Sequence, residues 1–149
     1  ASMTADCLPV LLADEAASGI GIAHAGWRGL AFGVIEATLQ MMKSKAPTVT
    51  TWYAYLGPAI GPKHFEVGPE VKDIFVSTHS QAAASFASVG SEGKFLANLY
   101  ALARIRLQLA GVHHIAGGSD CTYANRNFFS YRRDKTTGRM ASLIWRASQ

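Results

Sequence analysis

Two apolar segments on either side of a short polar turn constrain the fold of this chain most. Residues 8–14 are rich in Leu and Val, residues 19–24 alternate Ile with small residues, and the polar segment 14–18 lies between them. Two apolar runs joined by a short polar turn are typical of a β-hairpin. We therefore predict two antiparallel strands near the start of the chain.

The register of this hairpin decides how Cys7 lies relative to His24. A turn centred between Glu15 and Ala16 places Cys7 directly opposite His24, with Cβ atoms roughly 4.5–5.5 Å apart. At that spacing a thiolate and an imidazole can share a metal ion or act as nucleophile and base. A buried free cysteine beside a core histidine is the alternative. A catalytic zinc needs a third protein ligand. The other histidines show no recognisable ligand spacing: His64, His79, His113 and His114.

The remaining periodicities predict an α+β fold, with a layered mixed β-sheet and packed helices. The predicted helices cover 30–43, 95–109 and a shorter segment that begins near 68–70, where proline suits the first helical position. Beyond the hairpin, the predicted strands cover 50–56, 114–116, 128–131 and 142–145. Residues 57–62 are predicted to form a stiff loop. No repeat or linker is visible, which indicates a single domain over 1–149.

Several arginines are candidates for binding an anion. The turn 26–29 is predicted to leave a strand and open a helix, whose free N–H groups favour negative charge. Arg28 in this turn adds a guanidinium suited to phosphate or carboxylate. Arg132 and Arg133 supply two further cations. Structural packing of the turn, and a surface network of the arginines with Asp134, are the alternatives.

The charge and hydropathy patterns disfavour several broad classes of function. The chain has 14 Lys and Arg against 10 Asp and Glu, a formal net charge of +4. Basic residues gather in the last quarter, but no zinc-finger, RNA-recognition or helix-turn-helix pattern accompanies them, so we expect no nucleic-acid partner. The uncharged stretches are broken by proline or rich in serine, so we expect no membrane crossing. Two cysteines and no visible signal peptide favour a cytoplasmic location.

Four ordered motifs together resemble the YfiH family, whose historical names are laccase-domain protein, polyphenol oxidase and peptidoglycan editing factor. The motifs occupy Thr4–Val10, His24–Gly29, Gly57–Pro62 with Phe65–Gly68, and Cys121–Tyr123 with Phe128–Asp134 and Thr137–Arg139. The resemblance extends over essentially the whole chain. It implies a YfiH-like fold, and we expect the chain to correspond to the C-terminal part of a family member.

The resemblance implies a purine nucleoside phosphorylase that also deaminates adenosine. Its substrates would be phosphate and a small purine nucleoside such as adenosine, inosine or methylthioadenosine. It also implies a zinc held by one Cys and two His. Cys7 and His24 match two of these ligands, and the third lies upstream of the first motif in the family. Arg28 and Gly29 would hold phosphate, helped by Arg132 or Arg133.

Other functions remain open at this level. The family name suggests copper-dependent oxidation of phenols, with copper in place of zinc. Cys7 activated by His24 could instead cleave an amide-like bond in a peptidoglycan precursor. Because the third zinc ligand is missing from this chain, a module that binds a nucleoside without turnover is a further alternative. The absent part of the sheet would expose an edge and favour a homo-oligomer. The family usually has Asp where this chain has Asn98.

Overall fold

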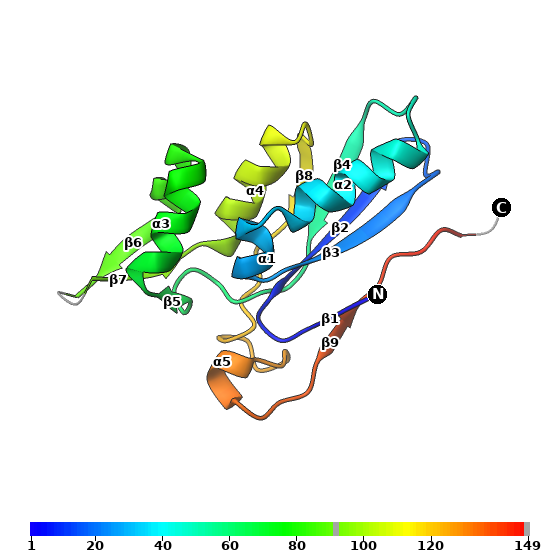
Figure 1. Ribbon diagram of the computed structural model, residues 1–149. Coiled ribbons are helices and arrows are strands. Elements are labelled where there is room, and N and C mark those ends of the chain that lie inside the picture. Colours follow the sequence, from blue (N-terminus) through cyan, green and yellow to red (C-terminus); the bar gives the residue numbers. More distant parts are fainter. Residues whose placement is uncertain (91–92, 148–149) are drawn as a thin grey trace.

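A four-stranded mixed sheet lies at the centre of the molecule (Figure 1). The computed structural model describes residues 1–90 and 93–147. In this sheet β2 (Leu8–Asp14) runs antiparallel to both of its neighbours, β3 (Ile20–Ala25) and β4 (Trp52–Leu56). The fourth strand, β8 (His114–Gly117), pairs with β4 in parallel. The apolar run that begins the predicted hairpin is therefore an interior strand.

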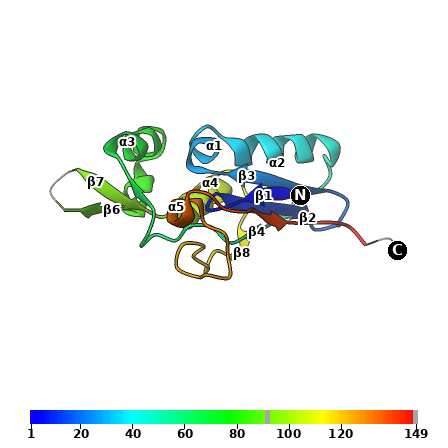
Figure 2. The same cartoon turned by 90° about the horizontal axis from the view of Figure 1, so that it is seen from below.

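Helices cover one face of this sheet. The helices α1 (Trp27–Ala31) and α2 (Val34–Lys45) lie together on one side of the sheet in Figure 2. The helix α4 (Leu99–Leu109) packs beside α2, and Arg106 of α4 forms an ion pair with Glu36 of α2. The two helices are thereby joined at their polar edge as well as through their apolar residues.

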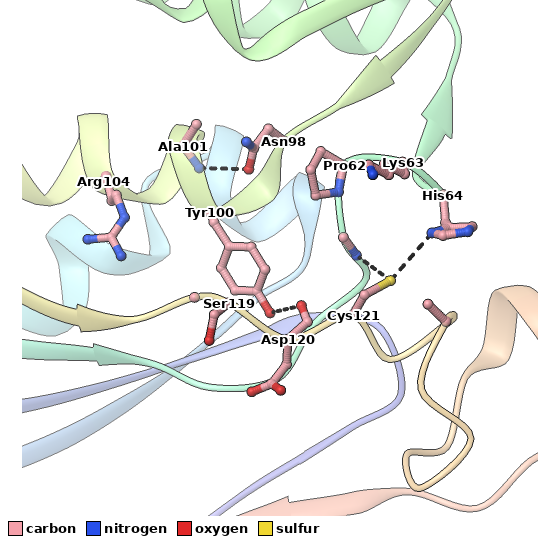
Figure 3. A pocket seen from close by; sticks show the side chains of 13 residues that line it. Pro62, Lys63, His64, Asn98, Tyr100, Ala101, Arg104, Ser119, Asp120 and Cys121 are labelled. Atoms are coloured by element: carbon pink, nitrogen blue, oxygen red, sulfur yellow. Dashed lines mark hydrogen bonds between the residues drawn. The ribbon is translucent and has the colours of Figure 1, made fainter.

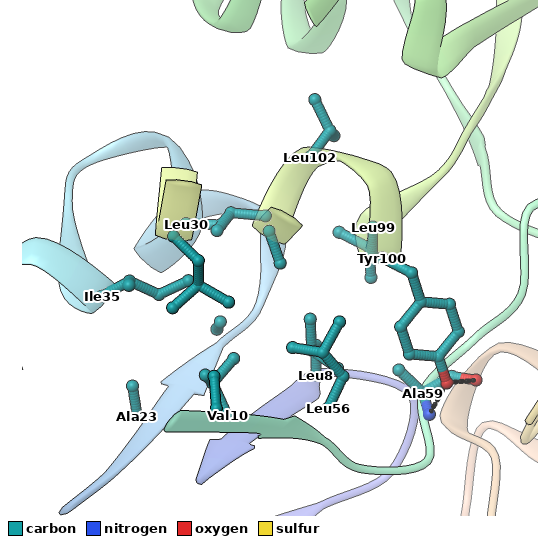
Figure 4. Close-up of a cluster of buried hydrophobic side chains, with 14 of the residues drawn as sticks. Leu8, Val10, Ala23, Leu30, Ile35, Leu56, Ala59, Leu99, Tyr100 and Leu102 are labelled. Atoms are coloured by element: carbon teal, nitrogen blue, oxygen red, sulfur yellow. Dashed lines mark hydrogen bonds between the residues drawn. The ribbon is translucent and has the colours of Figure 1, made fainter. Parts of the chain in front are cut away.

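The hydrophobic core lies between the sheet and these helices. Side chains alternate along a strand, so Val10 of β2 and Leu56 of β4 face the helices while Tyr53 and Tyr55 are exposed on the opposite face. Figure 4 shows Val10 and Leu56 beneath Leu30 of α1. Each fully buried leucine contributes about 1.5–3 kcal/mol relative to an exposed one. This packing fixes the positions of the loops at the end of the sheet.

Two smaller sheets flank the central one. One has the order β5–β7–β6, formed by Glu66–Val67, Lys94–Ala97 and Phe86–Val89, and is accompanied by α3 (Pro69–Thr78) and the 3-10 helix η1 (Ser80–Ser85). The other pairs β1 (Ser2–Thr4) with β9 (Met140–Ser142). This second pairing brings the last part of the chain, with the short helix α5 (Tyr131–Asp134), beside residues that precede β2 (Figure 1).

The predicted α+β class, with layered sheets and packed helices, is confirmed. The hairpin of residues 8–14 and 19–24 is present, and so are the strands near 50–56 and 114–116. The helix that begins at Pro69 has proline in its first turn, as predicted. None of the helices among the described residues has the length and apolarity that a transmembrane span requires.

Several predicted boundaries are wrong. The helix predicted over 30–43 is two helices, because Gly33 adopts a left-handed conformation with φ 87° and interrupts the helical path. The helix predicted over 95–109 begins as a strand, and α4 starts only after Asn98, whose side chain accepts a hydrogen bond from Ala101 N at 3.0 Å.

The C-terminal strand predictions also need correction. Residues 128–130 form no strand, and Tyr131 instead begins α5, capped by the Ser130 side chain. The strand predicted over 142–145 overlaps the observed β9 only at Ser142. The partner of β9 is β1 at the other end of the chain, so local propensity was a poor guide to the bounds of this strand.

Candidate functional site

The β2–β3 register differs from the predicted one. Leu8 pairs with Ala25 and Pro9 with His24, so Cys7 lies next to Gly26 instead of directly opposite His24. A Cβ atom on Gly26 would lie only 2.8 Å from Cys7 Sγ, which confirms this contact. The predicted direct Cys7–His24 pairing is therefore wrong. His24 lies two residues before Gly26, on the same side of the strand by alternation, and is exposed.

Asp14 explains the shift in register. Its carboxylate accepts hydrogen bonds from Ser18 N at 2.9 Å and from Ser18 Oγ at 2.7 Å, and a third from Gly19 N. Asp14 N also donates to the Gly19 carbonyl. These bonds close the turn between residues 14 and 19, so its centre lies one position later than the sequence pattern suggested. Burial alone would raise the pKa of Asp14, but these hydrogen bonds outweigh it and lower the pKa.

A small cavity of about 150 Å³ opens beside Cys7. Its walls come from five separate parts of the chain, and its lining includes Cys7, Trp27, Phe65, Tyr131 and Arg132. The Arg132 guanidinium donates to the Glu66 carbonyl at 3.0 Å and lies 5.4 Å from the centre of the Phe65 ring. The fold thus brings two of the predicted site residues, Cys7 and Arg132, to one cavity although 125 positions separate them.

Asp6 holds this cavity together. Its carboxylate accepts hydrogen bonds from Thr122 Oγ1 and from the Arg132 backbone N, both at 2.6 Å. Its backbone carbonyl accepts from Ile60 N at 3.0 Å. Asp6 is buried and has φ 88°, a conformation unusual for a residue other than glycine. We infer that Asp6 positions the neighbouring Cys7, a role that sequence reasoning missed although Asp6 belongs to the first motif.

The thiol of Cys7 lies in an environment that opposes its ionisation. Burial raises its pKa, the adjacent Asp6 carboxylate raises it further, and the positive charge of Arg139 lowers it. Arg139 therefore lies close enough to act on Cys7 electrostatically, and its guanidinium donates to the carbonyls of Thr137 and Gly138. Sequence reasoning did not include Arg139 among the site residues, although it ends the last family motif.

Arg28 and Gly29 lie beside the cavity without lining it. The Arg28 guanidinium stacks 4.3 Å above the ring of Trp27, which does line the cavity, and the Arg28 side chain is exposed. A Cβ atom on Gly29 would lie 3.1 Å from the His24 carbonyl oxygen, so Gly29 permits close packing of α1 on β3. Both residues belong to α1 itself instead of a turn before it, and this helix has five residues in place of the long run predicted, which reduces the dipole available to an anion.

Arg133 is engaged in a structural network. Its guanidinium donates to the carbonyls of Thr122, Tyr123 and Phe128 at 2.8–2.9 Å and pairs with the Asp134 carboxylate. These bonds tie the loop 122–128 to α5. They favour the network that the sequence left as an alternative, and the role of Arg133 in binding phosphate stays a prediction.

Cys7 and His24 supply a sulfur and a nitrogen donor of the kind that zinc and copper accept. Within residues 1–90 and 93–147 no three His, Cys, Asp or Glu side chains gather closely enough to hold a metal ion. The role of Cys7 and His24 as two of the three protein ligands of a catalytic zinc therefore stays a prediction. The residues present do not form a complete site by themselves.

Comparison with known proteins places the chain in a family. Residues 1–147 match the family described as multi-copper polyphenol oxidoreductase laccase. Purine nucleoside phosphorylase YfiH of Escherichia coli (strain K12) is 53% identical over 146 residues, covering 97% of this chain and 58% of the relative. A purine nucleoside phosphorylase of Pseudomonas aeruginosa is 49% identical over 144 residues, covering 96% of this chain and 58% of the relative. The chain thus spans little more than half the length of these curated relatives.

Solved structures agree in fold. A Neisseria meningitidis protein of family DUF152 superposes with a TM-score of 0.85 and 51% identity, covering 92% of this chain and 55% of the other. The Bacillus licheniformis hypothetical protein YfiH gives a TM-score of 0.85 with 35% identity, covering 92% of this chain and 53% of the other. On sequence and fold together, the chain belongs to the YfiH family, the family described as multi-copper polyphenol oxidoreductase laccase.

Proposed function

We propose that the protein acts in the phosphorolysis of purine nucleosides, with adenosine deamination as a second reaction, at the cavity beside Cys7. The observation that carries this proposal is the convergence of Cys7, Trp27 and Arg132 on one cavity. A sulfur ligand, an aromatic ring and a guanidinium are suited to a metal, a purine and a phosphate respectively. The names of the relatives, which are purine nucleoside phosphorylases, support the same substrates.

Each cavity residue has a distinct role in this proposal. In phosphorolysis a phosphate oxygen bonds to the ribose C1′ atom, the bond from C1′ to the purine nitrogen breaks, and the purine leaves with a proton. Arg132, oriented by its bond to the Glu66 carbonyl, would hold the phosphate against C1′. Trp27 would stack on the purine, and Arg28 above Trp27 would add positive potential at the rim.

A zinc ion would be held by Cys7 and His24 in this proposal. The third ligand would come from a polypeptide segment outside the described residues or from a second copy in a homo-oligomer. Zinc bound there would supply a Lewis acid for deamination. Asp6 would keep Cys7 in place through its bonds to Thr122 and Arg132.

The other candidate functions receive less support from the geometry. The register places Pro9, not Cys7, opposite His24, so the direct nucleophile–base pair that a hydrolase requires is not formed by these two residues. Copper-dependent oxidation of phenols is supported only by the description of the family. A third alternative is a module that binds a nucleoside without converting it, and the first experiment distinguishes this module from an enzyme.

That experiment is chromatography of the purified 149-residue chain after incubation with adenosine, with and without phosphate. Adenine that forms only with phosphate supports phosphorolysis, and inosine that forms without phosphate supports deamination. Neither product, in a protein that still binds adenosine, would show that the chain is a binding module. Phenol oxidation that appears only after copper loading would support the oxidase.

Two pairs of variants test the assigned residues. Cys7→Ser should lose both bound zinc and turnover, while Cys121→Ser, which alters a thiol outside this cavity, should keep both. Arg132→Gln should raise KM for phosphate about 10- to 100-fold, because a charge-assisted contact contributes about 1.5–3 kcal/mol. The matched control is Arg126→Gln, at an exposed arginine in the preceding loop. Retained zinc with full turnover in Cys7→Ser would refute the metal assignment.

A further inference from the structure

A second and larger cavity, of about 510 Å³, also borders the 57–62 loop. Ile60 lines the Cys7 cavity, and the next residue, Gly61, lines this one. Figure 3 shows its other walls, which include Cys121, His64 and Tyr100. A volume of this size is typical of a small-molecule site. Neither Cys7 nor Arg132 lines it, so a function of this second cavity does not depend on the proposed phosphorolysis.

Cys121 is a free, half-buried thiol held against a histidine in this cavity. Its Sγ lies 3.5 Å from His64 Nδ1 and accepts a hydrogen bond from Gly61 N at 3.2 Å. Figure 3 marks the contact between Cys121 and His64 with a dashed line. The His64 ring is itself fixed, because it stacks on Tyr123 with the ring centres 4.6 Å apart. The thiol is thus held between a group that can accept its proton and a donor that can stabilise the thiolate.

The close approach of Gly61 depends on the absence of a side chain. A Cβ atom on Gly61 would lie 2.9 Å from Cys121 Cβ and 3.0 Å from Sγ. Any other residue there would push the sulfur away from the Gly61 N–H or from His64. The backbone around Cys121 is also fixed, since Thr122 N donates to the Ala59 carbonyl at 3.0 Å and Asn125 N donates to the Cys121 carbonyl at 2.9 Å.

The charged residues that line the cavity favour an anionic partner. Lys63 and Arg104 carry positive charge and Asp120 carries negative charge, which leaves one net positive charge around the thiol. Arg104 is held in place by donating to the carbonyls of Ile115 and Gly117 at 3.2 and 2.7 Å. Lys63 lines the cavity and is exposed, so it can meet a carboxylate of an incoming molecule.

We propose that Cys121 is a thiol-exchange site, at which a small anionic disulfide enters the cavity and forms a reversible mixed disulfide. His64 takes the proton of the Cys121 thiol, and the thiolate attacks one sulfur of the disulfide. The sulfur–sulfur bond of the reagent breaks as the new one forms. The leaving thiolate then receives the proton from His64, so a thiol and a disulfide are exchanged with no net oxidation.

The test uses oxidised glutathione as the probe and intact-protein mass spectrometry as the measurement. In a Cys7→Ser background, where Cys121 is the only thiol, we expect one glutathionyl adduct that dithiothreitol removes. His64→Phe keeps an aromatic ring against Tyr123 and removes the base, so adduct formation should slow at least about tenfold. His113→Phe, at an exposed histidine outside the cavity, is the matched control and should react at the parental rate.

Two further comparisons separate a built site from an ordinary thiol. The folded chain should react faster than the same chain unfolded in urea, and oxidised glutathione should react faster than the neutral 2-hydroxyethyl disulfide. Lys63→Gln should reduce that preference. Equal rates in the folded and unfolded chains, or an unchanged rate in a His64→Phe variant with a native circular dichroism spectrum, would overturn the proposal. Equal rates for the two disulfides would overturn its anionic specificity.

Discussion

The Tyr100 hydroxyl contacts four backbone polar groups inside the protein. Replacing Tyr100 with Phe tests how much these contacts stabilise the fold. Tyr100 Oη accepts a hydrogen bond from Ala59 N at 2.7 Å and donates toward the Asp120 carbonyl at 2.9 Å. The carbonyls of Gly57 and Ala59 lie within 3.3–3.4 Å of the same oxygen. Burial raises the pKa of Tyr100 to about 12, so the hydroxyl stays protonated at neutral pH. The Tyr100 hydroxyl thus joins α4 to the 57–62 loop and to the loop that contains Asp120 and Cys121.

The expected loss of stability follows from the backbone groups that Tyr100→Phe leaves without a hydrogen-bond partner. Tyr100→Phe keeps the ring but leaves the N–H of Ala59 unpaired, at a residue with no exposed surface. An unsatisfied buried donor costs about 1–3 kcal/mol. For a chain of this size each kcal/mol lowers Tm by about 2–4 °C, so we expect a fall of about 2–12 °C.

Thermal melts and urea titrations of the 149-residue chain measure this change. The control is Tyr55→Phe, which removes a hydroxyl from a side chain that is 52% exposed and should alter stability by no more than about 0.5 kcal/mol. If both variants have the same Tm as the parent protein, Tyr100 Oη does not hold the two loops, and the reasoning about Ala59 is wrong.

Three further predictions concern the hairpin, the Cys7 cavity and the C-terminal loop. Because hydrogen bonds lower the pKa of Asp14 below its ordinary value of 3.8, its stabilising contribution is complete above that value and is lost as the pH falls through the lowered pKa. Urea unfolding from neutral to acidic pH should show this loss, and Asp14→Asn should flatten that part of the profile. Gly26→Ala should displace the Cys7 side chain, since the new Cβ would lie 2.8 Å from Sγ; an unchanged alkylation rate of Cys7 would argue against the contact. Arg133→Gln should speed amide hydrogen exchange in residues 122–128 by removing bonds to three carbonyls, whereas unaltered exchange there would show that the loop holds itself.

Patterns of neighbouring residues predicted the class of the fold and most of its central sheet. The strand-forming residues of 50–56 and the apolar run of 8–14 are local signals of strands with buried faces, and both strands are present. Pro69 marked the start of α3 for an equally local reason, because its fixed φ suits the first turn of a helix. The family was identified from motifs for the same reason, since each motif is contiguous in sequence.

The sequence by itself thus determined the secondary structure class, the family and Cys7 as the central candidate, whereas tertiary structure decided which groups meet. The register at Cys7 depends on hydrogen bonds to the Asp14 carboxylate, whose strength no periodicity reveals. The Cys7 cavity requires Arg132, and the second cavity joins Cys121 to His64, 57 residues earlier. Periodicity reports only which face of an element is buried, while contacts between distant segments form when packing and hydrogen bonding bring their loops together.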